Sequence, residues 1–344
     1  MNDFIQLSHQ SKTDRVHKPG LVVLLVILIL SLSGCQSASA PGTTAPSVAY
    51  PNGNLLVDAG WLADHIQEPN IRIIDMRAPD QYQKSHVPGS VNIPIEDITT
   101  SVNGIPFEID RQGVQSTLNR IGLAPEMTAV IYDNLGMMDS ARLFWTLEYA
   151  GHPDARILDG GWNAWQAGSL PESSEVPSIN ASQYPIRWQE AKLVTADQVL
   201  ADLNDPGVAI VDARSHQEYT GEVKLADRGG HIPGAVNLVW FDALTGGDTL
   251  PTIDPGWQAK LQDPDVELFK SVSDLQNLID NLGISRDQQI ITYCQTFWRG
   301  AHVYFLFRLM GYENVSGYDG SWAEWGNRSD LPVVTGDQPG TYTP

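Results

Sequence analysis

The stretch Gln289-Ile-Ile-Thr-Tyr-Cys294-Gln-Thr-Phe-Trp-Arg299-Gly300 decides how the rest of the chain is interpreted. Its apolar start predicts a short buried strand over 289–293, followed by a tight loop. A helix is expected over 301–310, with Gly311 as its C-cap. Cys294 would then lie between the end of a strand and the start of a helix, where backbone N–H groups and the positive end of the helix face it.

This position has a chemical consequence for Cys294. The thiolate is the reactive form of cysteine, and a thiol at the start of a helix should ionise more easily than a free one. Arg299 adds a permanent positive charge to the same loop. The alternative is a buried cysteine that packs as a small hydrophobic side chain. The cationic surroundings favour a nucleophile that lies beside a cradle for an anion.

Four segments occur twice in the same order, which indicates two copies of one structural unit. Apolar strands alternate with helical stretches such as 142–150 and 275–282, a pattern typical of parallel α/β domains. The matching segments are 71–77 with 208–214, 85–92 with 230–237, 129–133 with 290–294, and 160–165 with 320–325.

The Cys-x-x-x-x-Arg loop, the two His-x-Pro-Gly-x-x-Asn segments and the Asp-Gly-Ser-Trp-x-x-Trp segment resemble the tandem-domain rhodaneses, a family of sulfurtransferases. The resemblance implies an α/β fold of two tandem rhodanese-like domains, each a mostly parallel sheet with helices on both faces. It also implies that Cys294 is the nucleophile and carries sulfur as a persulfide. The residues expected to bind the substrate are Arg299, Arg214, Gln295, Thr296, Phe297 and Trp298.

The same resemblance implies a small anionic sulfur donor and a thiol or cyanide as acceptor. Thiosulfate is the expected donor, because Glu218 lies near the place where mercaptopyruvate-specific members carry a second arginine. The alternatives are 3-mercaptopyruvate as donor, and a membrane-tethered module that binds a partner without catalysis. A phosphatase or arsenate reductase is disfavoured, because their loops hold five residues between Cys and Arg.

The two copies differ where the chemistry would take place. Asp133 stands in the first copy where Cys294 stands in the second. A carboxylate cannot form a persulfide, so the first domain is predicted to be catalytically silent. Two roles are open for Arg214: it grips the substrate anion, as the resemblance implies, or it pairs with Asp212 or Glu218. His231 has a twin in the silent copy, so a structural role is expected for it.

The N-terminus has the pattern of an export signal. Three basic residues precede the apolar run 21–32, which is too short for a comfortable membrane span. The run ends in Leu32-Ser-Gly-Cys35, which resembles a bacterial lipobox and implies lipidation of Cys35. The alternatives are a plain signal peptide and an uncleaved anchor. We expect an exported lipoprotein on the periplasmic face of a membrane, and Gln36 favours the outer membrane in a Gram-negative cell.

The composition narrows the function further. The formal net charge of −20 makes nucleic acid an unfavourable partner and means that a local cationic pocket must bind any small anion. With Cys35 lipidated, Cys294 is the only thiol, which disfavours a dithiol oxidoreductase. The eight histidines show no metal-ligand spacing, so a metal site is not expected. We expect no other cofactor, and we expect a monomer.

These observations divide the chain into six parts. Proline, serine and asparagine residues around 171–190 mark a linker between the copies. The expected parts are a signal peptide (1–34), a flexible tether (35–53), the silent domain (54–170), a linker (171–192), the catalytic domain (193–332) and a C-terminal tail (333–344).

Overall fold

The computed structural model describes residues 49–247 and 268–343. The predicted signal peptide, Cys35 and most of the tether lie outside the described residues, as does much of the long insertion of the second copy. The described residues belong to one compact unit. None of the helices in these ranges is long and apolar enough to cross a membrane.

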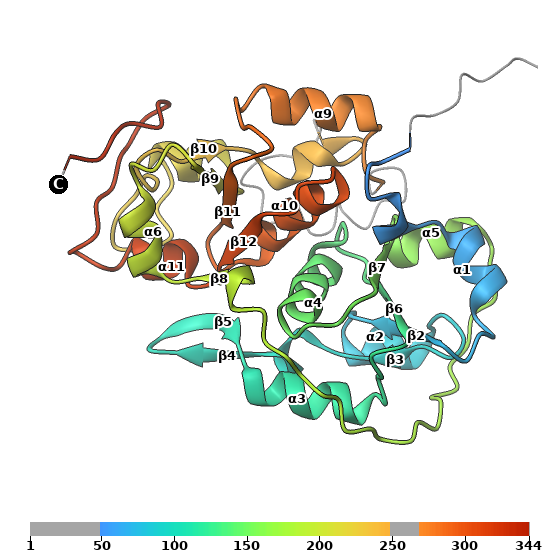
Figure 1. The fold of residues 1–344 in the computed structure, drawn as a ribbon. Coiled ribbons are helices and arrows are strands. Elements are labelled where there is room, and N and C mark those ends of the chain that lie inside the picture. The colour runs from blue at the N-terminus through green and yellow to red at the C-terminus, as the bar shows by residue number, and fades with distance from the viewer. Residues whose placement is uncertain (1–48, 248–267, 344) are drawn as a thin grey trace, which may run out of the picture. The chain divides into compact units, whose positions relative to one another are not determined.

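Two five-stranded parallel sheets form the framework of this unit, as the sequence predicted (Figure 1). The strand order is β1-β7-β6-β2-β3 in the first domain and β8-β12-β11-β9-β10 in the second. Each strand of one sheet therefore has a counterpart at the same place in the other, which confirms the internal repeat. The first domain adds a two-stranded antiparallel hairpin, β4–β5.

The elements of the first domain are β1 (Leu56–Val57), α1 (Ala59–His65), β2 (Ile71–Asp75), α2 (Pro79–Lys84), β3 (Val91–Asn92), β4 (Thr99–Val102), β5 (Ile105–Ile109), α3 (Arg111–Arg120), β6 (Thr128–Tyr132), α4 (Met138–Tyr149), β7 (Ala155–Leu158) and α5 (Gly161–Ala167). Short 3₁₀ turns occur at Gly53–Leu55 and Ile95–Asp97.

The elements of the second domain are β8 (Leu193–Val194), α6 (Ala196–Asp202), β9 (Val208–Asp212), α7 (His216–Thr220), β10 (Val236–Asn237), α9 (Val272–Asp280), β11 (Gln289–Tyr293), α10 (Trp298–Leu309), β12 (Val315–Tyr318) and α11 (Ser321–Trp325). Further 3₁₀ turns occur at Glu190–Lys192 and Trp240–Ala243.

The two domains meet through α4 and α10, which follow the central strands β6 and β11 (Figure 1). Both helices are buried on nearly all sides, because each covers its own sheet and also packs against the other helix. Phe144 and Phe305 meet edge to face, with ring centroids 4.8 Å apart. Glu148 of α4 accepts hydrogen bonds from the guanidinium of Arg308 on α10. The interface is therefore part of the hydrophobic core.

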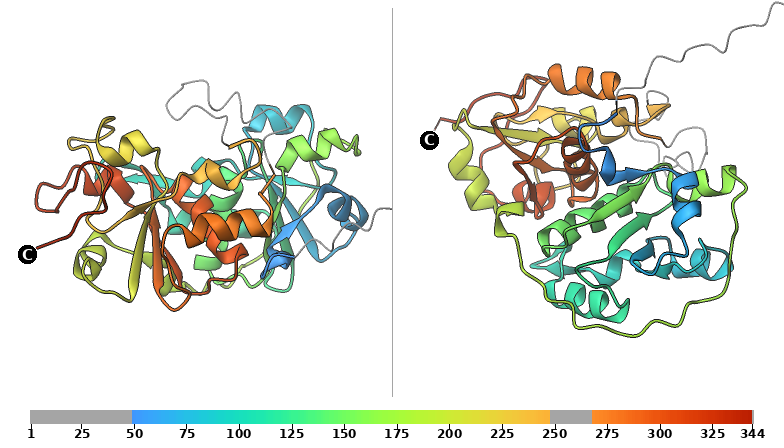
Figure 2. Two further views of the ribbon diagram at one scale, coloured as in Figure 1. Left: turned by 90° about the horizontal axis from the view of Figure 1, so that it is seen from above. Right: turned by 45° about the vertical axis from the view of Figure 1, so that its right-hand side comes forward.

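The linker is an extended segment that runs around the outside of the first domain (Figure 2). Ser173 forms a β-bridge with His86, and the Ser182 N–H donates to the carbonyl of Asn119 over 2.9 Å. Backbone hydrogen bonds thus attach the linker to the first domain before the chain enters β8.

The segments at both ends of the described chain are hydrogen-bonded to the second domain. The tether was expected to reach residue 53, but the Asn52 N–H donates to the carbonyl of Leu309, and the Tyr50 hydroxyl to that of Lys270. These bonds hold the chain against the second domain before residue 53. In the C-terminal tail, Val334 forms a β-bridge with His231. The tail is therefore paired with the second domain along part of its length.

Candidate active site

Cys294 lies directly after β11, between this strand and α10, as predicted. Its side chain is only 1% exposed. The Cys294 N–H donates to the hydroxyl of Ser321 over 3.3 Å, and its carbonyl accepts from the Trp322 N–H. Because the sulfur is recessed, a reaction partner has to reach it with a slender group such as a terminal sulfur atom.

The helix after the loop begins earlier than the sequence indicated. We expected it to start at Ala301, but α10 starts at Trp298 because Phe297 adopts a left-handed backbone, φ 61°, and acts as its N-cap. The helix ends at Leu309 with Met310 as its C-cap, so Gly311, with φ 82°, is the residue after the cap and not the cap that we expected. Arg299 therefore lies in the first turn of α10 and not in the preceding loop.

The corresponding loop of the first domain is filled by its own carboxylate. One oxygen of Asp133 accepts from the N–H groups of Leu135 and Met137, at 2.7 and 3.1 Å, and the other from Ser140 at 2.7 Å. Burial raises the pKa of Asp133, and these backbone hydrogen bonds oppose the shift. The turn between the central strand and its helix thus forms a cradle of N–H groups for an anion.

The two loops can be aligned by their backbone. Met137 before α4 and Phe297 before α10 are both left-handed N-caps, with φ of 62° and 61°. In this alignment, Asp139 of the first domain occupies the position equivalent to Arg299 of the second. Burial and the nearby carboxylates of Asp133 and Glu96 raise the pKa of Asp139 well above its usual range.

Arg299 is held by a carboxylate in a two-point ion pair. Its Nη1 and Nη2 atoms lie 2.6 and 2.9 Å from the two oxygens of Glu218. Burial alone would raise the pKa of Glu218, but the hydrogen bonds and charge of Arg299, together with the charge of Arg214, lower it to about 2. Glu218 is therefore ionised at neutral pH. Burial would lower the pKa of Arg299, but the hydrogen bonds and charge of Glu218, with smaller contributions from Cys294 and Asp212, raise it.

Arg214 has the geometry of a structural ion pair. Its Nη2 atom lies 2.6 Å from a carboxylate oxygen of Asp212, and also donates to the carbonyl of Gly230. Arg77 makes the same contact with Asp75 in the first domain, also at 2.6 Å. The guanidinium of Arg214 is 1% exposed. The second of the two roles considered for Arg214 is therefore the one that the geometry supports.

The side chains of Phe297 and Trp298 contact the first domain. Phe297 is fully buried, and its ring lies 4.8 Å from Trp145 in an edge-to-face contact. We predicted that Phe297 contacts the substrate. Its side chain instead packs into the interface between the two domains, where it cannot reach a substrate bound at Cys294. Trp298 stacks on Phe107 of the β4–β5 hairpin, with ring centroids 4.6 Å apart. Sequence reasoning did not identify Phe107.

Gln295 and Thr296 are half-buried and remain the polar side chains of the loop. The Gln295 amide donates to the carbonyl of Leu225 over 3.0 Å, while its side-chain oxygen is buried and has no hydrogen-bond partner among the described residues. His231 is fully buried, and its ring nitrogens face the carbonyls of Tyr219 and Gln338. These contacts support the structural role expected for His231.

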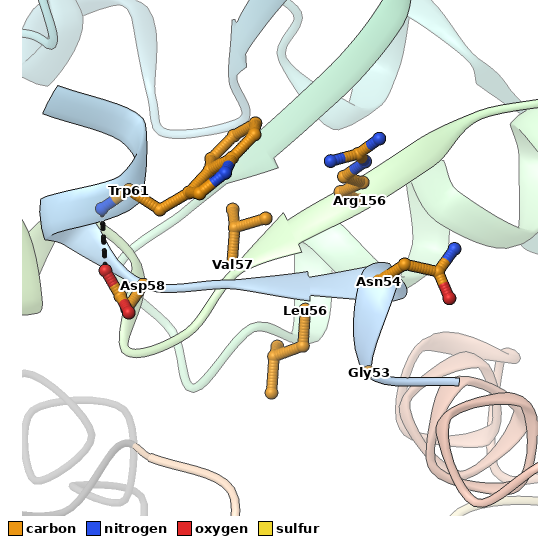
Figure 3. Close-up of a pocket in the computed structure, with 7 residues that line it drawn as sticks. All are labelled: Gly53, Asn54, Leu56, Val57, Asp58, Trp61 and Arg156. Atoms are coloured by element: carbon orange, nitrogen blue, oxygen red, sulfur yellow. Dashed lines mark hydrogen bonds between the residues drawn. The ribbon is translucent and has the colours of Figure 1, made fainter. Parts of the chain in front are cut away.

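A surface pocket of about 210 Å³ lies elsewhere, in the first domain (Figure 3). In this pocket, the guanidinium of Arg156 lies 5.3 Å from the ring centroid of Trp61, and the Trp61 N–H donates to Asp58. The lining residues are Gly53, Asn54, Leu56, Val57, Asp58, Trp61 and Arg156. None of the residues predicted for the active site belongs to this pocket.

The fold and the recessed Cys294 define a class of protein: a duplicated α/β protein whose second domain carries a cysteine between its central strand and the helix that follows. Residues 58–168 and 195–328 match the family model of the rhodanese-like domain. The chain is 31% identical to the sulfur carrier protein TtuD of Thermus thermophilus, over 85% of this chain and 100% of the relative. It is 32% identical to a thiosulfate sulfurtransferase of Corynebacterium glutamicum, over 84% and 93% of the two chains.

Solved structures agree with these sequence relatives. The crystal structure of YnjE superposes with a TM-score of 0.72 at 26% identity, over 84% of this chain and 70% of the other. An anaerobic ergothioneine biosynthesis enzyme from Chlorobium limicola has a TM-score of 0.71 at 25% identity, over 83% and 71%. The chain belongs to the rhodanese family, which confirms the fold class and the expected class of enzyme, a sulfurtransferase.

Proposed function

We propose that the protein transfers a sulfane sulfur from thiosulfate to a thiophilic acceptor, cyanide or a thiol, through a persulfide on Cys294. The observation that carries the proposal is the strand–loop–helix geometry, which brings Cys294 to a turn whose counterpart binds a carboxylate with backbone N–H groups. Relatives that cover most of the chain are named thiosulfate sulfurtransferases, including one from Azotobacter vinelandii with 31% identity.

The reaction has two balanced half-reactions. The Cys294 thiolate attacks the outer sulfur of thiosulfate, the S–S bond of the donor breaks, and sulfite leaves with its electron pair. The acceptor then attacks the outer sulfur of the persulfide, which restores the thiolate; cyanide becomes thiocyanate. The N–H groups at the start of α10 would stabilise the persulfide anion in the same way that their counterparts hold Asp133. A covalent intermediate of this kind predicts ping-pong kinetics.

The substrate-binding residues proposed around Cys294 are Arg299, Gln295, Thr296 and Trp298. All four side chains are half-buried, in the loop after Cys294 or in the first turn of α10, and this placement supports the assignment. For the first domain we propose a structural role: the hairpin residue Phe107 stacks on Trp298, and Arg142 pairs with Asp319 over 2.6 Å across the domain interface. The first domain would thus form one wall of the site without performing chemistry.

Steady-state kinetics test this function. Thiocyanate formation from thiosulfate and cyanide should give parallel lines in double-reciprocal plots, the pattern of a ping-pong mechanism. Activity with 3-mercaptopyruvate and not with thiosulfate would favour the alternative donor. No activity with either donor would favour a binding module.

We further propose that the protein is an exported, membrane-anchored lipoprotein on the periplasmic face. The support is the sequence alone: the basic N-terminus, the apolar run and the lipobox that ends at Cys35. Metabolic labelling with a radioactive fatty acid tests this proposal, because Cys35→Ser should abolish the label.

A further inference from the structure

The ion pair of Arg299 and Glu218 leaves little free charge on the arginine next to Cys294. Both terminal nitrogens of the guanidinium bind a Glu218 oxygen, at 2.6 and 2.9 Å. The side chains are 19% and 6% exposed, so water screens the pair only in part. A donor that approaches Cys294 therefore meets a compensated ion pair, not a free cation.

Glu218 is fixed in this position by the start of α7. It is the third residue of α7 and completes a capping box with Ser215: its Oε2 atom accepts from the Ser215 N–H at 3.1 Å and from the Ser215 hydroxyl at 2.9 Å. The same oxygen binds Nη1 of Arg299. Because the helix start holds the carboxylate, Glu218 cannot swing away from Arg299 without breaking its own cap.

The first domain contains a natural counter-example. Gln81 follows Asp75 and Arg77 at the same spacing as Glu218 follows Asp212 and Arg214. The position equivalent to Arg299 is occupied by Asp139. The silent copy therefore has neither the carboxylate, which would lie on α2, nor the arginine. The ion pair therefore occurs in the domain that carries the thiol. Gln81 also shows that an amide fits this place in the fold.

We propose that Glu218 determines which donors Cys294 accepts: by neutralising Arg299, it makes the site favour a singly charged sulfane donor over the doubly charged thiosulfate. Glu218 acts through Arg299 and is thus a specificity-determining residue. The inference rests on the proposed function and specifies its substrate class. With a thiosulfonate, the Cys294 thiolate attacks the outer sulfur, the S–S bond breaks, and a sulfinate leaves with the electron pair.

The test compares thiosulfate, a dianion, with benzenethiosulfonate, a monoanion, at fixed ionic strength and with cyanide as acceptor. The wild-type protein should have the higher kcat/KM with benzenethiosulfonate. Glu218→Gln frees the charge of Arg299 while its amide oxygen still accepts from Ser215. Its KM for thiosulfate should fall about tenfold, with kcat changed less than about twofold, because a freed guanidinium adds a charge-assisted hydrogen bond to the dianion.

Two further variants keep the result specific. Glu175→Gln makes the same chemical change on the exposed linker and should leave both KM values unchanged. Arg299→Gln combined with Glu218→Gln should lose the gain in thiosulfate affinity. A fall in KM for Glu175→Gln would instead show a general effect of net charge and overturn the proposal.

The remaining outcomes separate the inference from the proposed function. If thiosulfate forms a persulfide but Glu218→Gln leaves its KM unchanged or raises it, the role of Glu218 is overturned and the function stands. If no donor forms a persulfide on Cys294 in any variant, the proposed function fails and the inference fails with it. Mass spectrometry of the intact protein distinguishes these two cases.

Discussion

The Asp133 loop and the Cys294 loop are two versions of one turn, and they differ in the charges they hold. In the first domain the bound anion is a side chain of the protein itself, because the Asp133 carboxylate accepts hydrogen bonds from three backbone N–H groups. In the second domain a thiol takes this place, and Arg299 occupies the position equivalent to Asp139. The difference teaches that the turn is an anion cradle, filled permanently in one copy and, we infer, filled by a persulfide in the other.

The largest expected effect follows from removing the sulfur of the second loop. Cys294→Ser should lower thiocyanate formation at least about a thousandfold, because a hydroxyl at this place cannot carry sulfane sulfur. Chemical denaturation should give a nearly unchanged free energy of unfolding. Residual activity close to that of the wild-type protein would show that the loops do not differ in the way described.

A pair of matched variants separates the two roles of Arg214. Arg214→Ala and its twin Arg77→Ala each leave a buried aspartate without its partner, so each should lower the free energy of unfolding by about 3–5 kcal/mol. The donor KM should respond alike in the two variants. A KM that rises only in Arg214→Ala would show that this arginine also grips the substrate.

The acid limb of the stability curve tests the Glu218 ion pair. Its folded-state pKa of about 2 lies below the ordinary value of 4.5, so its contribution is present above about pH 4.5 and is lost as the pH falls toward 2. The full shift corresponds to about 3 kcal/mol. Glu218→Gln should remove this part of the pH dependence, measured by urea unfolding at several pH values. An unchanged acid limb would contradict the ion pair.

The smallest expected effect concerns the anion of the first loop. Asp133→Asn keeps one oxygen for Leu135 and Met137 but turns an amide NH₂ toward the Ser140 N–H. Two donors then face each other, and the free energy of unfolding should fall by about 2 kcal/mol in urea denaturation. A variant as stable as the wild type would show that the cradle does not require an anion.

The sequence predicted the repeat, the parallel sheets and the place of Cys294, because these follow from apolar periodicity and repeated motifs. It did not predict the left-handed backbone of Phe297 and Met137, since bulky residues rarely adopt positive φ. The predicted starts of α4 and α10 were therefore wrong. The alignment that makes Asp139 equivalent to Arg299 could not be derived from them.

Long-range contacts were the second limit. Glu218 and Arg299 are 81 positions apart, and no local pattern joins them. The signal that could have identified the pair lies in the repeat itself, where Glu218 is matched by Gln81 and the arginine is missing. Phe107 belongs to a hairpin, β4–β5, that has no counterpart among the repeated segments, so the repeat gave no guide to its contact with Trp298.

The central claim, that the second loop carries sulfur and the first cannot, is tested most directly by intact-protein mass spectrometry after incubation with thiosulfate. The account predicts that the wild-type protein gains the mass of one sulfur atom, that cyanide removes it, and that Cys294→Ser gains none. A sulfur atom acquired by the Cys294→Ser variant, or none acquired by the wild type, would contradict it.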